Sequence, residues 1–112
     1  MYNERIMATT QPARARVDEA SLMAQLTREG LSGERWSNGP HALYPPHDHP
    51  YGKVLVVVSG RITLTIEGAR RRLVEMRPGD RMELPPRTLH SAVAGPEGVV
   101  CIEAHRPEAA RR

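Results

Sequence analysis

Residues 47–60, HDHPYGKVLVVVSG, combine two histidines, a proline, a lysine and an apolar run that ends at Gly60. The valine-rich part of this stretch, KVLVVV, is typical of a buried β-strand. In an extended chain, residues two apart point to the same side, so His47 and His49 can converge on one point. Two ring nitrogens at one point suit a metal ion, although a His-x-His pair in a loop is also typical of polar surface.

Further short strands are predicted on both sides of this stretch. Apolar or alternating segments are separated by turn residues such as Arg77-Pro78-Gly79-Asp80, at spacings of about 8 to 12 residues. About seven such segments predict an all-β domain, a sandwich or barrel of antiparallel strands. The predicted strands are residues 34–45, 53–58, 61–68, 72–76, 81–85, 90–94 and 99–105, and the first of these is interrupted by Gly39-Pro40.

One helix is predicted before the strands, in residues 17–30, VDEASLMAQLTREG. Asp18 can cap its beginning and Gly30 can end it. A short helix with a narrow apolar stripe is stable only when it packs against something else. The residues expected on that stripe are Leu22, Met23 and Leu26.

The length of 112 residues predicts one domain, residues 17–105, between a disordered leader (1–16) and a disordered tail (106–112). The net charge of +3 belongs to these ends, because each contains three arginines and one glutamate. The remaining body is slightly acidic and lacks the basic face that phosphate binding needs. We therefore expect no nucleic-acid partner.

Cys101 is the only cysteine, so the chain cannot form an intramolecular disulfide. No apolar run approaches the roughly 18 residues of a membrane span, and residues 1–16 lack the apolar core of a secretory signal. These features predict a cytoplasmic protein with no membrane partner.

A second segment, residues 78–90, PGDRMELPPRTLH, places His90 at the start of a predicted strand. If the strands close into a barrel, His90 can face His47 and His49 from a neighbouring strand. Three imidazoles at one depth are enough to hold a divalent ion and still leave coordination positions open.

Together, these two segments resemble the two signature motifs of the cupin superfamily, over residues 41–94. The first motif is roughly G-x5-H-x-H-x3/4-E-x6-G, and the second is roughly G-x5-P-x-G-x2-H-x3-N. The resemblance implies a single small jelly-roll barrel, with the predicted helix outside it. The positions that agree with the motifs are His47, His49, Gly60, Gly79, Pro85 and His90.

Four motif positions differ. His41 and Arg87 stand where the motifs have glycine, and Ala94 stands where the second motif has asparagine. Lys53 replaces the usual carboxylate ligand, four residues after His49, so a regular strand would place it on the histidines' face. An ammonium group there removes one ligand and repels a cation by several kcal/mol in a poorly solvated pocket.

Three outcomes are open for Lys53. Three neutral imidazoles can still bind a divalent ion, as in the cupin-like thiol and diketone dioxygenases that this arrangement resembles, with Lys53 orienting an anionic substrate. Alternatively, Lys53 abolishes metal binding, or its flexible side chain extends out of the barrel mouth and affects neither. We favour metal binding, with Fe, Zn, Ni or Mn as candidates.

Three other residues have two interpretations each. Tyr51 can hold a substrate oxygen or can cover the barrel rim. Glu103 can face inward, as a ligand or as a partner of Lys53, or can face solvent. His41 can be a fourth ligand or an ordinary polar turn residue.

The predicted function is a small metal-binding cupin, interpreted as a mononuclear metal enzyme of the dioxygenase or isomerase type acting on a small polar molecule. Its predicted metal ligands are His47, His49 and His90, and its catalytic candidates are Lys53 and Tyr51. The alternative is a module that binds a small ligand or a metal without turnover. An exposed strand-rich face also predicts a homodimer.

Overall fold

Two long strands, β4 and β7, pair with each other along nearly their whole lengths, and every other strand pairs with one of them. The structure is a computed structural model that describes residues 17–106. All strand pairs are antiparallel. The elements are α1 (Glu19–Arg28), β2 (Glu34–Asn38), β3 (Leu43–His47), β4 (Gly52–Ile66), β5 (Arg72–Met76), β6 (Arg81–Leu84) and β7 (His90–Arg106).

The β4–β7 ladder bends near its middle. Its pairing runs from Gly52 opposite Arg106 to Ile66 opposite His90, with two register shifts in between, on either side of Gly60. Gly60 has φ of 76° and Gly98 has φ of 81°, a left-handed conformation that residues with a Cβ adopt only at a cost. Such irregularities increase strand twist and let one ladder bend over on itself.

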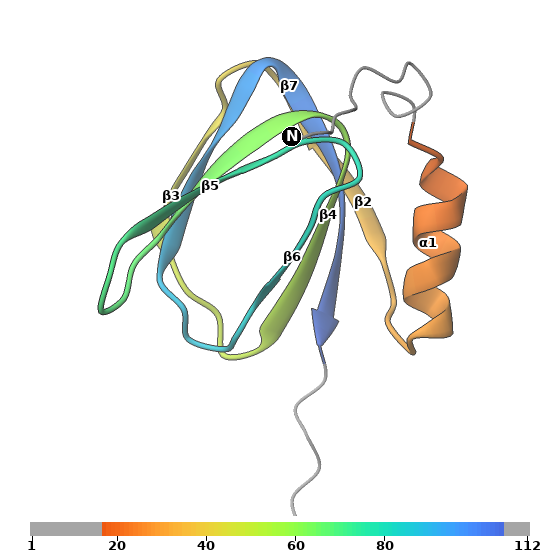
Figure 1. Cartoon of the computed structure of the whole chain (residues 1–112), viewed down its shortest axis with the longest axis horizontal. Helices are drawn as coiled ribbons and strands as arrows, with labels where there is room; N and C mark the ends of the chain where they lie inside the picture. The colour runs from red at the N-terminus through yellow and green to blue at the C-terminus, as the bar shows by residue number, and fades with distance from the viewer. Residues whose placement is uncertain (1–16, 107–112) are drawn as a thin grey trace, which may run out of the picture.

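The bend divides the strands into two halves. The first half of β4 and the second half of β7 are flanked by β6 and β2. The second half of β4 and the first half of β7 are flanked by β5 and β3. Figure 1 shows these strands curving around a common interior, with α1 outside, beside β2. This arrangement confirms the predicted all-β jelly-roll barrel with one short N-terminal helix.

Residues 54–57 of β4 are buried on both faces of the sheet. Val54 and Val56 of β4 point outward and pack with Ile102 and with Leu26 of α1. Their neighbours along the strand point inward and join the barrel core. This explains why KVLVVV is a continuous apolar run, since a strand that is covered on both faces needs no polar side. The buried residues of the inner cluster are Leu55, Val57, Ile62, Leu64, Met76, Leu84, Ala94, Val99 and Cys101.

Helix α1 begins and ends as predicted. The Asp18 side chain accepts a hydrogen bond from the backbone N–H of Ala20 at 3.1 Å, which satisfies one free donor of the first turn. Gly30, with φ of 81°, follows the C-cap. Leu26 is the buried residue of the helix and contributes about 2 kcal/mol by leaving water. The predicted stripe therefore packs on the outer face of the barrel.

The prediction of about seven strands was wrong in its divisions. Predicted strands 53–58 and 61–68 are one strand, β4, and predicted strands 90–94 and 99–105 are one strand, β7. The glycines between them bend the ladder and do not end it. In the segment 34–45, the predicted interruption at Gly39-Pro40 is confirmed, because these residues separate β2 from β3.

The predicted leader, residues 1–16, and residues 107–112 of the predicted tail lie outside the described residues. The predicted tail includes Arg106, which in the structure is the last residue of β7. Within residues 17–106, no helix has the length and apolar character needed to cross a membrane.

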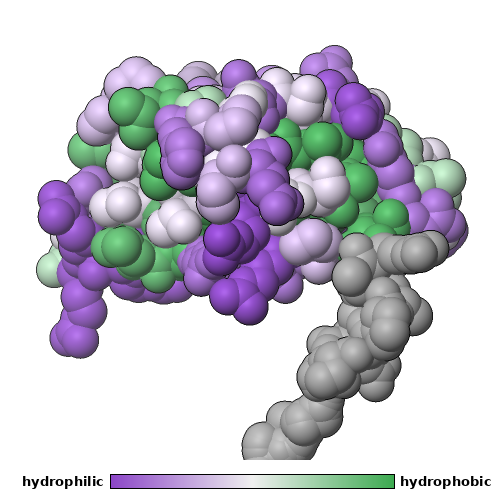
Figure 2. Space-filling model, turned by 90° about the horizontal axis from the view of Figure 1, so that it is seen from above, coloured by the Kyte–Doolittle hydropathy of each residue, from purple (hydrophilic) through white to green (hydrophobic). Residues whose placement is uncertain are grey.

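The two ends of the barrel differ. Figure 2 shows the end that is at the top of Figure 1, where β4 and β7 bend. There, hydrophobic side chains lie in separate groups with a band of hydrophilic side chains between them. The histidines lie at the opposite end, where β3 stops and β7 begins.

The close backbone contact at the bend predicts that Gly60 does not tolerate a side chain. A Cβ on Gly60 would overlap the carbonyl group of Gly98, whereas a Cβ on Gly30 would meet nothing within 4 Å. Both have positive φ. We expect Gly60→Ala to lower the free energy of unfolding by about 2–5 kcal/mol, and Gly30→Ala by about 1–2 kcal/mol, measured by chemical denaturation. Equal losses would show that the backbone at Gly60 can move away freely.

Candidate metal centre

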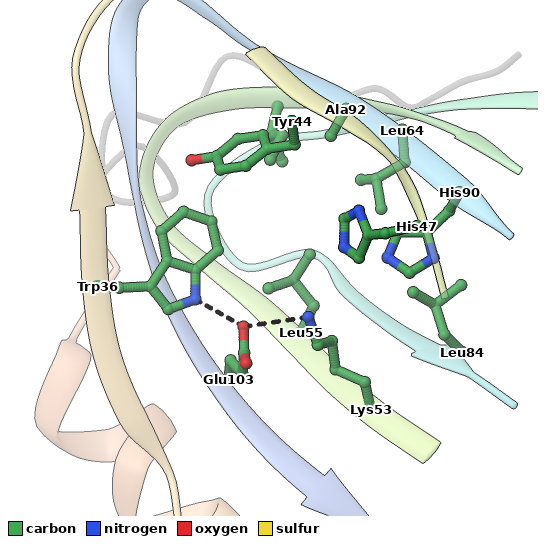
Figure 3. Close-up of a pocket in the computed structure, with 11 residues that line it drawn as sticks. Trp36, Tyr44, His47, Lys53, Leu55, Leu64, Leu84, His90, Ala92 and Glu103 are labelled. Carbon is green, nitrogen blue, oxygen red and sulfur yellow. Dashed lines mark hydrogen bonds and ion pairs between the residues drawn. The ribbon is translucent and has the colours of Figure 1, made fainter. Parts of the chain in front are cut away.

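Three histidines meet at the end of the barrel where β3 stops and β7 begins. His47 is the last residue of β3 and lies directly opposite His90, the first residue of β7. His49 follows in the loop before β4. One ligand nitrogen from each ring lies within 4.8 Å of the others. Figure 3 shows His47 and His90 side by side at the edge of a cavity.

The convergence of His47 and His49 has a different cause from the one predicted. β3 ends at His47, so the alternation of an extended strand does not continue to His49. The loop holds His49 instead, because its carbonyl oxygen accepts a hydrogen bond from the backbone N–H of Arg87 at 2.6 Å. The two histidine segments are therefore joined through their backbones.

Hydrogen bonds to the backbone define which ring nitrogen faces the centre. Nδ1 of His47 lies 2.6 Å from the carbonyl oxygen of Pro45, and Nδ1 of His90 lies 2.7 Å from that of Thr88. A carbonyl oxygen only accepts, so each Nδ1 carries the hydrogen. In a neutral imidazole the lone pair is then on Nε2, which is the arrangement that backbone partners impose on metal-binding histidines.

The environment favours the neutral form of two of these rings. Burial lowers the pKa of His49, and the nearby Lys53 ammonium lowers it further. Burial is also the main cause of the lowered pKa of His90. An uncharged ring is the form that can donate a lone pair to a metal.

One buried nitrogen of the cluster has no hydrogen-bond partner. Nε2 of His49 is buried and has no hydrogen-bond partner among the described residues. A buried polar atom without a partner costs about 1–3 kcal/mol, so such atoms are rare without a reason. A divalent ion at the centre of the three rings would bind this atom, and three imidazole nitrogens suit Fe, Zn or Ni. The residues present therefore fit a metal ion.

The histidines open onto a cavity of about 200 Å³ inside the barrel. Its walls are mainly apolar, with two aromatic rings at the far side from the histidines (Figure 3). A cavity of this size admits only a small molecule. The lining residues are Trp36, Tyr44, His47, Lys53, Leu55, Ile62, Leu64, Leu84, His90, Ala92 and Glu103.

Lys53 and Glu103 form an ion pair in the wall of this cavity. The Lys53 ammonium nitrogen lies 3.4 Å from Oε1 of Glu103, and both side chains are mostly buried. The same oxygen accepts a hydrogen bond from Nε1 of Trp36 at 2.8 Å, so it is held from two sides (Figure 3). Of the alternatives left open for Glu103, the structure shows the inward one, as the partner of Lys53.

Strand alternation explains why both charges face inward. Lys53 lies an even number of residues from Leu55 and Val57 in β4, so it points to the same, inner face. Glu103 is likewise on the same face of β7 as Cys101. The residues between them form the outer face that α1 covers. Lys53 thus shares the cavity with the histidines as expected, although β4, and not an extension of the His47 strand, puts it there.

Tyr51 lies beside the histidines but does not line this cavity. Its ring stacks on His105, with ring centroids 3.8 Å apart, and on His49 at 4.9 Å. The structure therefore places Tyr51 as a cover over His49 at the rim. Tyr51 lines a second, outer pocket instead.

His41 lies outside the cluster. It is exposed in the turn before β3, where its backbone N–H donates to Gly95, as expected for an ordinary turn residue. Two cavity residues, Trp36 and Tyr44, were missed as site residues by the sequence analysis. Their rings meet edge to face, with centroids 5.7 Å apart. The available signal was their place in predicted strands, in a chain with only 4% aromatic residues.

Comparisons with known proteins agree with this geometry. A family model described as "Cupin domain" matches residues 35–104. An RmlC-like cupin from Shewanella frigidimarina is 26% identical, with a TM-score of 0.60 over 70% of this chain and 67% of that chain. No curated protein matches the chain in sequence.

More distant structures share the fold alone. Oxalate decarboxylase from Bacillus subtilis, in a study of its Mn(II) centres, is 20% identical, with a TM-score of 0.64 over 72% of this chain. The present chain spans about a fifth of that protein, 22% of its length. Drosophila melanogaster CENP-C bound to CAL1 is 16% identical, with a TM-score of 0.58 over 68% of this chain and 64% of that chain.

The burial of the Lys53–Glu103 ion pair predicts that its two members stabilise the protein jointly. We expect Lys53→Met and Glu103→Gln each to destabilise the protein by about 1–3 kcal/mol, because each leaves a mostly buried charge without its partner. The double variant should lose less than the sum of the two, with a coupling energy of about 1–2 kcal/mol by denaturant unfolding.

An exposed pair serves as the matched control. Arg61 and Glu75 lie 3.0 Å apart with both side chains more than 40% exposed. The cycle with Arg61→Met and Glu75→Gln should give a coupling of at most about 0.5 kcal/mol. A Lys53–Glu103 coupling as small as this would mean that solvent screens the cavity pair.

Proposed function

Because the chain belongs to the cupin domain family, we propose that it is a mononuclear metal enzyme acting on a small polar molecule. The observation that carries the proposal is the histidine cluster itself. Three imidazoles meet at one point beside a cavity, two of them with backbone-bonded Nδ1 atoms and the third with a buried, unpartnered Nε2. The proposed ligands are His47, His49 and His90.

The metal would act as a Lewis acid or as a binding site for dioxygen, with coordination positions left for substrate. Iron would point to the dioxygenase type, whereas zinc, nickel or manganese would suit an isomerase. The Mn(II) centres of the similar oxalate decarboxylase support manganese among these candidates.

The chain's own residues would select and position the substrate. Lys53 would bind a polar group of the substrate inside the cavity, and Glu103 would keep the ammonium in place while the cavity is empty. The apolar walls would exclude water from the reacting group. Tyr51 would close the rim over His49.

One observation favours the alternative, a module that binds a small molecule without turnover. The two charged cavity residues, Lys53 and Glu103, neutralise each other, and burial raises the pKa of the Tyr44 hydroxyl, which therefore keeps its proton. Few groups in the cavity are therefore free to transfer a proton. The fold also occurs in CENP-C, whose structure contains the bound CAL1.

Metal content tests the proposal directly. Protein purified without a histidine tag should contain about one divalent ion per chain by elemental analysis, and His47→Ala should reduce this at least about tenfold. His41→Ala and His105→Ala should keep the metal, because neither residue belongs to the cluster. A metal that survives His47→Ala, or is lost equally from His41→Ala, would refute the assignment. Metal-free protein that still binds a small molecule would favour the module.

The expected homodimer has a candidate surface. Leu43 of β3 lies directly opposite Val93 of β7, and Leu73 of β5 lies on the same outer face of this half of the barrel. Their exposed fractions are 78%, 36% and 68%, respectively. Apolar side chains grouped on an outer sheet face are typical of a surface that another molecule covers.

Light scattering after size-exclusion chromatography tests this surface. We expect a mass of about twice the 12.5 kDa chain, because two copies can bury these side chains against each other. Leu43→Lys combined with Leu73→Lys should give a monomer, and Ser37→Lys, on exposed β2, should not. A monomeric wild-type protein would contradict the expectation.

A further inference from the structure

A second pocket, of about 460 Å³, lies at the mouth of the barrel beside the histidine cavity. The two share Lys53 and Leu84 in their walls, so the pocket adjoins the cavity. Three prolines and Tyr51 make much of its surface apolar. The lining residues are Pro50, Tyr51, Gly52, Lys53, Glu83, Leu84, Pro85, Pro86, Arg87 and Arg106.

Arg87 stands in this pocket with an unfavourable backbone. Its φ is 59°, in the left-handed region, which costs a residue with a Cβ about 1–2 kcal/mol. The backbone N–H of the same residue donates a hydrogen bond to the carbonyl oxygen of His49. Glycine would satisfy the same turn without strain, and glycine is what the cupin motif has at this position. An arginine in this strained conformation, where glycine would fit without strain, indicates a functional role for the arginine side chain.

The charges of the pocket leave one cation available. Both carboxylate oxygens of Glu83 lie 3.0 Å from the Arg106 guanidinium, and Glu103 pairs with Lys53. Arg87 is exposed and forms no ion pair with any residue in the described part of the chain. Of the three cations in the pocket wall, only Arg87 lacks a carboxylate partner there.

We propose that Arg87 binds a carboxylate group of the ligand at the barrel mouth, next to the histidine centre. The planar guanidinium matches a carboxylate with two parallel hydrogen bonds, and one available cation balances one such charge. Because the Arg87 backbone is bonded to His49, the same turn positions the ligand's anion and one of the three histidines.

An anion site at Arg87 restricts the class of ligand to small carboxylates. The identity of this ligand as a substrate rests on the proposed function, but the anion site itself needs no metal. The ligand is a small monocarboxylate, held at the mouth by its anionic group and extending toward the cavity with an uncharged body. The apolar walls of both the pocket and the cavity suit such a body.

Binding of butyrate tests the site, with uncharged butyramide as the matched probe of the same shape. Both are titrated by NMR into full-length protein, with and without metal, and the Arg87 Nε–H resonance is followed. Wild-type protein should bind butyrate at least about tenfold more tightly than butyramide, the usual effect of a charge-assisted hydrogen bond.

Substitutions distinguish the contribution of the Arg87 side chain to binding from the contribution of its backbone conformation to stability. Arg87→Gly should raise the Kd for butyrate about tenfold while leaving the melting temperature unchanged or higher, because glycine relieves the strained φ. Arg87→Lys should retain part of the affinity. Arg70→Gly, which removes the same charge from the exposed β4–β5 turn, should leave binding unchanged.

Several results would overturn the proposal. Equal affinity of butyrate for wild type and Arg87→Gly would do so, as would equal affinity for butyrate and butyramide, or no binding of butyrate at all. Loss of binding in Lys53→Met but not in Arg87→Gly would assign the anion to the inner cavity. Butyrate binding that depends on Arg87 in protein that never takes up metal would refute the proposed function but support the anion site.

Discussion

The antiparallel pairing of β4 with β7 is the constraint on which the rest of this structure depends. The ladder runs from Gly52 opposite Arg106 to Ile66 opposite His90 and bends between the two ends. Because the bend lies in the middle, both ends of β4 come to the same end of the barrel. Lys53, near one end of the ladder, and His90, at the other, therefore line one cavity. Hydrogen bonds far from the histidines thus determine where the histidines meet.

The cavity combines two features that oppose each other electrostatically. Three imidazoles provide lone pairs for a cation, yet Lys53 stands where cupins commonly have a carboxylate ligand. The opposition is reduced because Glu103, on the neighbouring strand, compensates the ammonium within the same wall. The pair adds little net charge, so the cluster remains able to attract a divalent ion. The cavity wall therefore does contain a carboxylate. It belongs to Glu103 of β7, and it pairs with Lys53.

Local sequence patterns predicted the helix and the character of the strands well. Asp18 and Gly30 act within a few residues of their positions, so their effects can be derived without knowing the fold. The strand divisions were less predictable. A glycine such as Gly60 ends a strand or bends it according to what pairs with the flanking residues, and that partner is distant in sequence. The role of Glu103 was undecided for the same reason, since only the position of α1 shows which face of β7 is outside.

The sequence by itself determined the class of fold, the capped helix, the two histidine segments and the replacement of a carboxylate by Lys53. These follow from spacing, alternation and residue type, which are properties of short segments. Only the tertiary structure decided that the three rings meet, that Nε2 of His49 is left without a partner, and that Arg87 shares a turn with His49. The physical reason is that these features arise from contacts between segments about 40 residues apart. Whether two such segments touch is decided by the pairing and bending of strands elsewhere in the chain.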